Sequence, residues 1–171
     1  QVYSQLRETD LFDQRDILAQ GITGNRDKIL KQFSSGKNSI LLGASSFWEG
    51  IDLPDSALEL LIITRLPFDS PDEIMNRAHN KLLQQQGKNP FYHSELPKAT
   101  MRLRQGIGRL LRTEDDHGVA VVLDPRLQTR RYGKTILSSL PTDLPVSGKK
   151  TAELISITQK FLQNGKEDKV N

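Results

Sequence analysis

The chain has 171 residues, of which 36% are hydrophobic and 26% charged, with no cysteine and a formal net charge of +3. The length fits one globular domain with a proper core, and the lack of cysteine excludes a disulfide framework or a thiolate metal site and fits a reducing, cytoplasmic compartment. A charge this small leaves any nucleic-acid contact to local basic patches, and no apolar run is long enough for a membrane span, so we expect no membrane partner.

Apolar strands alternate with helices along most of the chain. Strands are expected at residues 16–19, 39–44, 58–64 and 119–123. Helices are expected at about 1–8, 26–33 (capped by Thr23 or Asn25), 71–86, 96–113 and 128–140. This alternation predicts a parallel α/β sheet, in which ligands bind beyond the carboxyl ends of the strands.

The two ends of the chain are predicted to differ from this α/β pattern. The chain opens without a Met, inside a predicted helix, so we expect a piece cut from a longer protein. Near the other end, an amphipathic helix at 151–163 is predicted to stop at Asn164-Gly165 and to be followed by a charged, disordered tail. We therefore expect an α/β domain at 1–150, a helix at 151–164 and a tail at 165–171.

The chain is organised around an arginine motif near the end of the predicted helix 96–113. Gln105, Gly108, Arg109 and Arg112 form the pattern Q-x-x-G-R-x-x-R, whose spacing places the glutamine and both arginines on one helical stripe. The glycine at 108, like the one two residues earlier, costs a helix about 1 kcal/mol relative to alanine, which predicts close approach of another group to the backbone. Planar guanidinium groups bind phosphate well, so this pattern favours a phosphate-binding role for the two arginines. The alternative is a solvated basic helix face with surface salt bridges.

A second polar stretch, residues 44–54, directly follows a predicted buried strand. Its chemistry-bearing residues are Ser45, Ser46, Trp48, Glu49, Gly50 and Asp52. Small residues after a strand leave backbone N–H groups open to an anion, and Asp52 or Glu49 can accept a ribose hydroxyl or orient an arginine. A tight surface loop with solvated carboxylates is the alternative, and Trp48 is expected to pack as core.

These two motifs, with Leu66-Pro67-Phe68 between them, resemble the second motor lobe of DinG helicases, in the XPD-like branch of superfamily 2. Residues 46–54 resemble helicase motif V and residues 105–112 resemble motif VI, and the likeness covers about 17–140 in order. Residues 89–91, 96–97 and 131–134 look like further DinG-type features. The resemblance implies a RecA-like (P-loop NTPase-type) lobe, a three-layer α/β/α parallel sheet, here missing its first strand.

The resemblance also implies a role for each motif residue. The lobe would close over ATP and Mg²⁺ held mainly by the absent first lobe of the same polypeptide. Arg109 and Arg112 would reach the phosphates as arginine fingers, and Gln105 would help position the γ-phosphate or the attacking water. An arginine placed there can be worth about 10³ to 10⁵ in rate. The nucleotide-binding residues would be Glu49, Gly50, Asp52 and Gly108, and the strand-binding residues would include Ser45 and Ser46.

Further nucleic-acid contacts are expected from cations and aromatic rings near the arginine motif. The cations are Arg102, Arg131 and Lys134, beside Lys98, Arg104, Arg126 and Arg130. Phe91, Tyr92 and Tyr132 are candidates for a stacking platform, with core packing as the alternative. The three histidines show no metal spacing, so we expect no metal site. Without G-x-x-x-x-G-K-[ST] or an obvious acidic Mg²⁺ motif, the chain alone is expected to bind no cofactor and to be inactive.

Three functions fit these observations. The first is the C-terminal motor lobe of an ATP-dependent DNA helicase or translocase, acting on single-stranded DNA in repair or replication. The second is a nucleotide-regulated DNA-binding module whose fused exonuclease domain performs the chemistry. The third is a phosphate-binding or scaffold domain with no motor role. RNA or an RNA–DNA hybrid stays open as a substrate.

Overall fold

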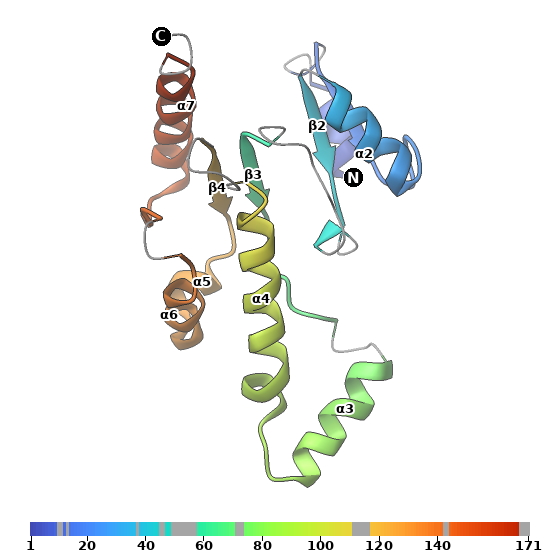
Figure 1. Ribbon diagram of the computed structural model, residues 1–171, viewed down its shortest axis with the longest axis vertical. Coiled ribbons are helices and arrows are strands. Elements are labelled where there is room, and N and C mark those ends of the chain that lie inside the picture. The colour runs from blue at the N-terminus through green and yellow to red at the C-terminus, as the bar shows by residue number, and fades with distance from the viewer. Residues whose placement is uncertain are drawn as a thin grey trace. The chain divides into compact units, whose positions relative to one another are not determined.

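The computed structural model describes residues 1–9, 12, 14–36, 38–44, 47–48, 58–70, 74–110, 117–141 and 144–167, without the side chains of 164–167. The chain divides into two compact units, Gln1–Ala57 and Leu58–Asn171. Figure 1 shows both units, with most of their helices and strands labelled. No helix in the described ranges is long and apolar enough to cross a membrane.

The first unit is a single strand–helix–strand motif preceded by a short helix. Its elements are α1 (Val2–Arg7), β1 (Asp16–Ala19), α2 (Arg26–Ser35) and β2 (Ser39–Leu42). The two strands pair in parallel, with Ile17 opposite Ile40, and α2 is the crossover between them. Asn25 caps α2 by accepting the Lys28 N–H at 3.0 Å, and Ile29 of α2 is buried, as the sequence predicted.

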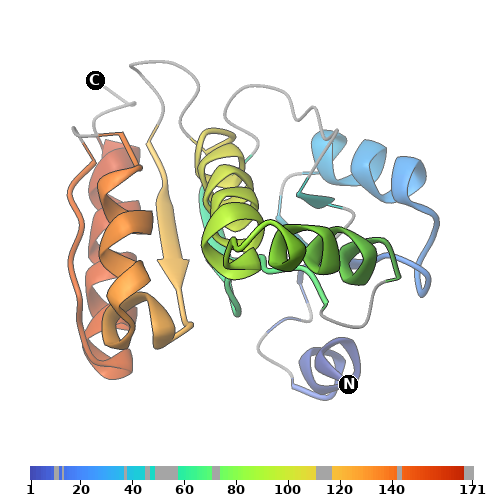
Figure 2. The same ribbon diagram turned by 90° about the horizontal axis from the view of Figure 1, so that it is seen from below.

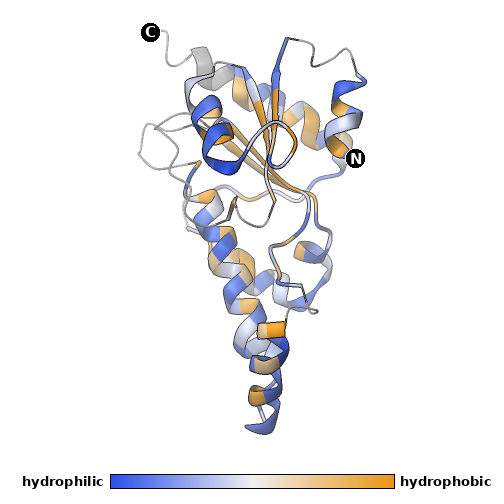
Figure 3. Ribbon diagram, turned by 90° about the vertical axis from the view of Figure 1, so that its right-hand side faces the viewer, coloured by the Kyte–Doolittle hydropathy of each residue, from blue (hydrophilic) through white to orange (hydrophobic). Residues whose placement is uncertain are grey.

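The second unit is built on another parallel strand pair. Its elements are β3 (Leu60–Ile63), α3 (Ile74–Gln85), the π-helix η3 (Phe91–Glu95), α4 (Leu96–Ile107), β4 (Val119–Val122), α5 (Arg126–Thr129), α6 (Arg131–Ser138) and α7 (Thr151–Glu167). Leu60 pairs with Val119, and Leu103 of α4 and Ile136 of α6 are among the most deeply buried side chains. Figures 1 and 2 both show β4 between α4 and α7, and α7 contacts β4. Figure 3 shows the strands as largely hydrophobic ribbon and the helices as mixed.

Two predicted helices differ from the structure, and a glycine lies near each point of difference. The helix expected at 96–113 ends at Ile107, and Gly108 begins a turn in which its N–H donates to the Arg104 carbonyl. The helix expected at 128–140 is two helices, α5 and α6, separated at Arg130, which is extended (φ −100°, ψ 144°). Gly133 explains this break, since α6 folds back so closely on α5 that a Cβ there would lie 1.9 Å from the Leu127 carbonyl oxygen.

The C-terminal helix is longer than predicted. It runs to Glu167, past Gly165, so the stop at Asn164-Gly165 was wrong and residues 165–167 of the expected disordered tail are helical. A single glycine costs a helix about 1 kcal/mol, which is too little to end it by itself.

The parallel pairing and the crossover helices confirm the α/β class. The strands in the described part of the chain pair as two separate two-stranded sheets, one in each unit, rather than as the single sheet that the sequence predicted.

Candidate functional site

Six of the predicted site residues lie outside the described residues. They are Ser45, Ser46, Glu49, Gly50, Asp52 and Arg112. The described candidates are Gln105, Gly108, Arg109, Arg102, Arg131 and Lys134.

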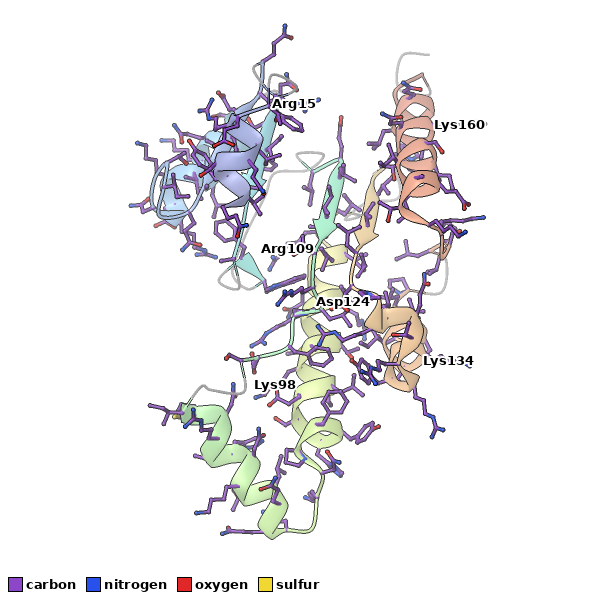
Figure 4. The ribbon with its side chains drawn as sticks, turned by 180° about the vertical axis from the view of Figure 1, so that it is seen from behind. Arg15, Lys98, Arg109, Asp124, Lys134 and Lys160 are labelled. Carbon is purple, nitrogen blue, oxygen red and sulfur yellow. The ribbon has the colours of Figure 1, made fainter. Side chains whose placement is uncertain are left out.

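Arg109 lies in the turn that follows α4, not on the helix itself. Its N–H donates to the Gly106 carbonyl at 3.3 Å, and the Leu110 N–H donates to the Ile107 carbonyl at 2.9 Å. Leu110 and Ile107 are buried, so the turn is anchored on both sides of the half-buried arginine. The prediction that Gln105 and both arginines share one helical stripe was therefore wrong at Arg109, because the helix ends two residues before it. Figure 4 labels Arg109 at this end of α4.

Gln105 and Gly108 are both exposed beside this turn. Gly108 has a helical backbone (φ −63°), and the nearest atom to a Cβ placed there is the Arg104 carbonyl oxygen, at 3.2 Å. The backbone angle therefore does not require glycine at this position. What the missing side chain leaves is an accessible peptide next to Arg109, which another group can approach closely.

A buried carboxylate fastens the loop after β3 to the end of β4. The Asp124 side chain is 3% exposed and accepts the Leu66 N–H at 2.8 Å, the Arg126 N–H at 3.0 Å and the Arg126 Nη2 at 2.6 Å. The Arg126 guanidinium, followed by the two backbone N–H groups and against the effect of burial, lowers the pKa of Asp124 to about 2. The same contact raises the pKa of Arg126. Sequence reasoning treated these two residues only as a strand end and a cation, although an acid directly after a buried strand with an arginine two residues later signals such a pair.

A second carboxylate, Asp69, holds α4. The Arg102 Nη1 donates to Asp69 and, at 3.4 Å, to the Pro67 carbonyl, and the Lys98 Nζ lies 3.7 Å from Asp69 Oδ2. The Asp69 and Arg102 side chains are only 13% and 23% exposed. Arg102 was predicted to bind nucleic acid, but its guanidinium has this partner inside the chain, and a DNA phosphate would have to compete with Asp69 for it. The geometry assigns Arg102 to positioning α4 on the loop after β3.

The predicted aromatic platform is mostly a packed cluster. The Phe91 ring centre lies 5.6 Å from that of Phe68 and 5.0 Å from that of Tyr132, and Phe68 and Tyr132 meet edge to face at 5.7 Å. The Arg126 guanidinium carbon lies 5.4 Å from the Phe68 ring centre. Phe91 and Tyr132 are half-buried in this cluster, which agrees with core packing. Tyr92 differs, because its side chain is exposed.

Arg130, Arg131 and Lys134 are exposed where α5 meets α6, and we call them the α6 cations. Arg131 and Lys134 are three residues apart on α6 and therefore lie on neighbouring positions of its outer face. Figure 4 shows Lys134 on α6. Among the residues that the structure describes, none of the three forms an ion pair, in contrast to Arg102 and Arg126.

The first unit contains a cavity of about 470 Å³ at the carboxyl ends of β1 and β2. Its walls include Tyr3, Gln20, Gly21, Leu42 and Gly43, and none of the described residues that line it has a charged side chain. Gly21 has φ +77°, a conformation that favours glycine, in the tight loop after β1. Parallel sheets bind ligands at this edge, and sequence reasoning missed the contribution of the loop at Gln20-Gly21.

A metal site is not formed by the described side chains. In the ranges given above, no three His, Cys, Asp or Glu residues gather closely enough to hold a metal ion.

Comparison with known proteins identifies the family. The family model described as "Helicase C-terminal domain" matches residues 1–143. The chain belongs to this family, as a DinG-type helicase C-terminal domain. Its α7 helix lies beyond the matched residues.

Three relatives illustrate the similarity. The chain is 44% identical over 142 residues to the 3'-5' exonuclease DinG of Bacillus subtilis, covering 82% of this chain and 15% of the relative. It is 43% identical over 148 residues to the ATP-dependent DNA helicase YoaA of Haemophilus influenzae, covering 86% of this chain and 22% of that protein. It is 46% identical over 125 residues to YoaA of Escherichia coli, also named an ATP-dependent DNA helicase, covering 73% and 20%. The chain thus spans about a fifth or less of the length of these relatives.

Proposed function

We propose that this chain is the C-terminal motor lobe of an ATP-dependent DNA helicase or translocase that acts on single-stranded DNA. The observation that carries the proposal is the anchored Arg109 turn, which belongs to a motif-VI-like stretch in a helicase C-terminal domain. The proposed architecture is a RecA-like lobe with three layers. Its partner would be an N-terminal motor lobe of the same polypeptide, which holds most of the contacts to ATP and Mg²⁺.

The proposed chemistry is stabilisation of charge during phosphoryl transfer. Negative charge on the transferred phosphoryl group spreads over its equatorial oxygens, and a guanidinium beside it lowers the barrier. Arg109 would supply one such group and Arg112 a second. Arg109 is suited to this role because the buried neighbours on both sides of it restrict the turn, so that little conformational entropy is lost when it meets the phosphate.

The remaining motif residues would surround these arginines. Gln105 would orient the attacking water or the γ-phosphate, and the accessible peptide at Gly108 would let the nucleotide approach the turn. The other proposed nucleotide contacts are Glu49, Gly50 and Asp52, and the proposed strand contacts are Ser45, Ser46, Arg131 and Lys134. Because the arginines come from a lobe other than the one that binds ATP, hydrolysis would occur only when the lobes close, which couples turnover to movement along the strand.

The test is steady-state ATP hydrolysis by the full-length protein with and without single-stranded DNA. Arg109→Ala should lower the DNA-stimulated rate by about 10³-fold or more while DNA affinity is kept. Arg109→Lys should rescue little, because a lysine lacks the planar fork. Arg15→Ala, an exposed arginine outside the motif, is the matched control and should keep the rate. A normal rate in Arg109→Ala would refute the proposal.

A second candidate is favoured by the name of one relative. The Bacillus subtilis relative is named a 3'-5' exonuclease, so this lobe could serve as a nucleotide-regulated DNA-binding module beside a fused exonuclease domain. In that case the full-length protein would degrade DNA, and its ATP turnover would be absent or independent of DNA. Measuring nuclease and ATPase activities on the same preparation separates the two functions.

A further inference from the structure

Tyr92 presents an exposed ring that is backed by a rigid cluster. Its side chain is 57% exposed, yet its ring centre lies 5.2 Å from that of Phe91, edge to face at 84°. Phe91 is itself held between Phe68 and Tyr132. Tyr92 lies in η3, and π-helical segments are rare and often mark functional sites. A large ring that is already restrained can accept a stacking partner with little loss of entropy.

The aromatic cluster joins this ring to the α6 cations. Phe91 in η3 contacts both Tyr92 and Tyr132, and Tyr132 lies on α6 between Arg131 and Lys134 in the sequence. The cations near the aromatic cluster differ in their partners. Those that meet Asp69 or Asp124 join parts of the fold, whereas the α6 cations are exposed and form no ion pair among the described residues.

An exposed ring, linked through Phe91 and Tyr132 to the helix that carries exposed cations, matches the chemistry of an unpaired nucleic-acid strand. The cations would attract backbone phosphates, and the ring would stack on a base, a contact that every base can make and that a duplex does not offer. We propose that Tyr92 and the α6 cations form a second contact surface for single-stranded DNA, outside the two helicase-like motifs. This inference rests on the proposed function and extends it, because it adds a contact to a base to the contacts with phosphates.

The ring is tested by comparing two probes on the full-length protein by fluorescence anisotropy. One probe is an oligothymidine, and the other is an abasic oligomer with the same deoxyribose-phosphate backbone. Tyr92→Ala should weaken binding of oligothymidine by about 5- to 150-fold, the range for one base stacked on an aromatic side chain, and should leave the abasic probe unchanged. Tyr92→Trp should restore binding. Phe161→Ala, which removes an exposed ring of α7, is the matched control and should change neither affinity.

The cations are tested by the salt dependence of the same binding. Arg131→Ala and Lys134→Ala should each weaken both probes and reduce the slope of log K against log salt by about 0.7, the value for one phosphate contact on a single strand. Lys160→Ala, an exposed lysine of α7, should leave the slope unchanged.

Each outcome decides for or against this surface. Wild-type affinity in Tyr92→Ala, an equal loss on the abasic probe, or an equal loss in Phe161→Ala would overturn it. The outcome of the ATPase test of Arg109 is independent of this test. If Arg109→Ala turns over ATP normally while Tyr92→Ala loses base-dependent binding, the contact surface is supported and the motor role is refuted. If Arg109→Ala is inactive and Tyr92→Ala binds normally, only the surface is refuted.

Discussion

Replacing Asp124 with asparagine tests the carboxylate that joins the ends of β3 and β4. The asparagine keeps one acceptor oxygen but turns an NH₂ group toward N–H donors that the carboxylate now accepts, from Leu66 and from Arg126. Breaking a buried ion pair costs about 3 to 5 kcal/mol when the remaining charge stays buried. The Arg126 side chain is 41% exposed and can regain water, so we expect a loss of about 2 to 3 kcal/mol in the free energy of unfolding at pH 7.

The same variant makes a prediction about pH. The pKa of Asp124 is lowered from 3.8 to about 2 in the folded protein, so the folded state favours the ionised form. Its contribution, about 2 kcal/mol, is therefore present above about pH 4 and is lost as the pH falls toward 2. The difference in unfolding free energy between the wild type and Asp124→Asn should shrink by about that amount over this window.

Urea unfolding followed by circular dichroism, at several pH values between 7 and 2.5, measures this difference. Using the variant as the reference cancels the titration of the other groups. Asp16→Asn, at an exposed position at the start of β1, is the matched control and should cost less than about 0.5 kcal/mol. A gap between wild type and Asp124→Asn that stays constant down to pH 2.5, or no loss at pH 7, would refute the assigned role of Asp124.

Three further substitutions test the positions of α4 and α6. Arg102→Ala should lower the free energy of unfolding by about 1 to 3 kcal/mol, Asp69→Asn should lower it by about as much, and the double variant should lose less than the sum of the two. If Arg102→Ala instead weakens DNA binding and reduces its salt dependence without a loss of stability, Arg102 contacts DNA and does not position α4. Gly133→Ala should destabilise by about 1 to 3 kcal/mol or more, because the new Cβ would lie 1.9 Å from the backbone oxygen of Leu127, measured by the same unfolding assay. Thr135→Ala, exposed on α6, is its control, and equal stability of the two variants would contradict the close packing of α5 on α6.

Local patterns in the sequence were sufficient for the parallel α/β class and for most of the elements. The strands at 16–19 and 119–122 are visible as short apolar runs and the cap at Asn25 as a side chain three residues before the N–H that it accepts, so these signals can be read locally even though the strands pair with distant residues. The family, too, could be recognised from the sequence, because it is carried by short motifs in a set order. Helix ends were less predictable. The helix α4 ends at Ile107, directly before Gly108, whereas α7 continues through Gly165, because the cost of about 1 kcal/mol for a glycine is small enough for the surrounding packing to decide.

The partner of Arg102 was decided only by the tertiary structure. From the sequence, Arg102 and Arg131 are equivalent cations near one motif, whereas Arg126 has a possible partner, Asp124, two residues away. In the structure Arg102 and Arg126 meet carboxylates, Arg102 one that lies 33 positions away, whereas Arg131 remains exposed. The same holds for the aromatic residues, of which Tyr92 is exposed while Phe91 packs against Phe68. A sequence pattern records the type and spacing of side chains, but a charge is free or neutralised according to which distant segment folds against it.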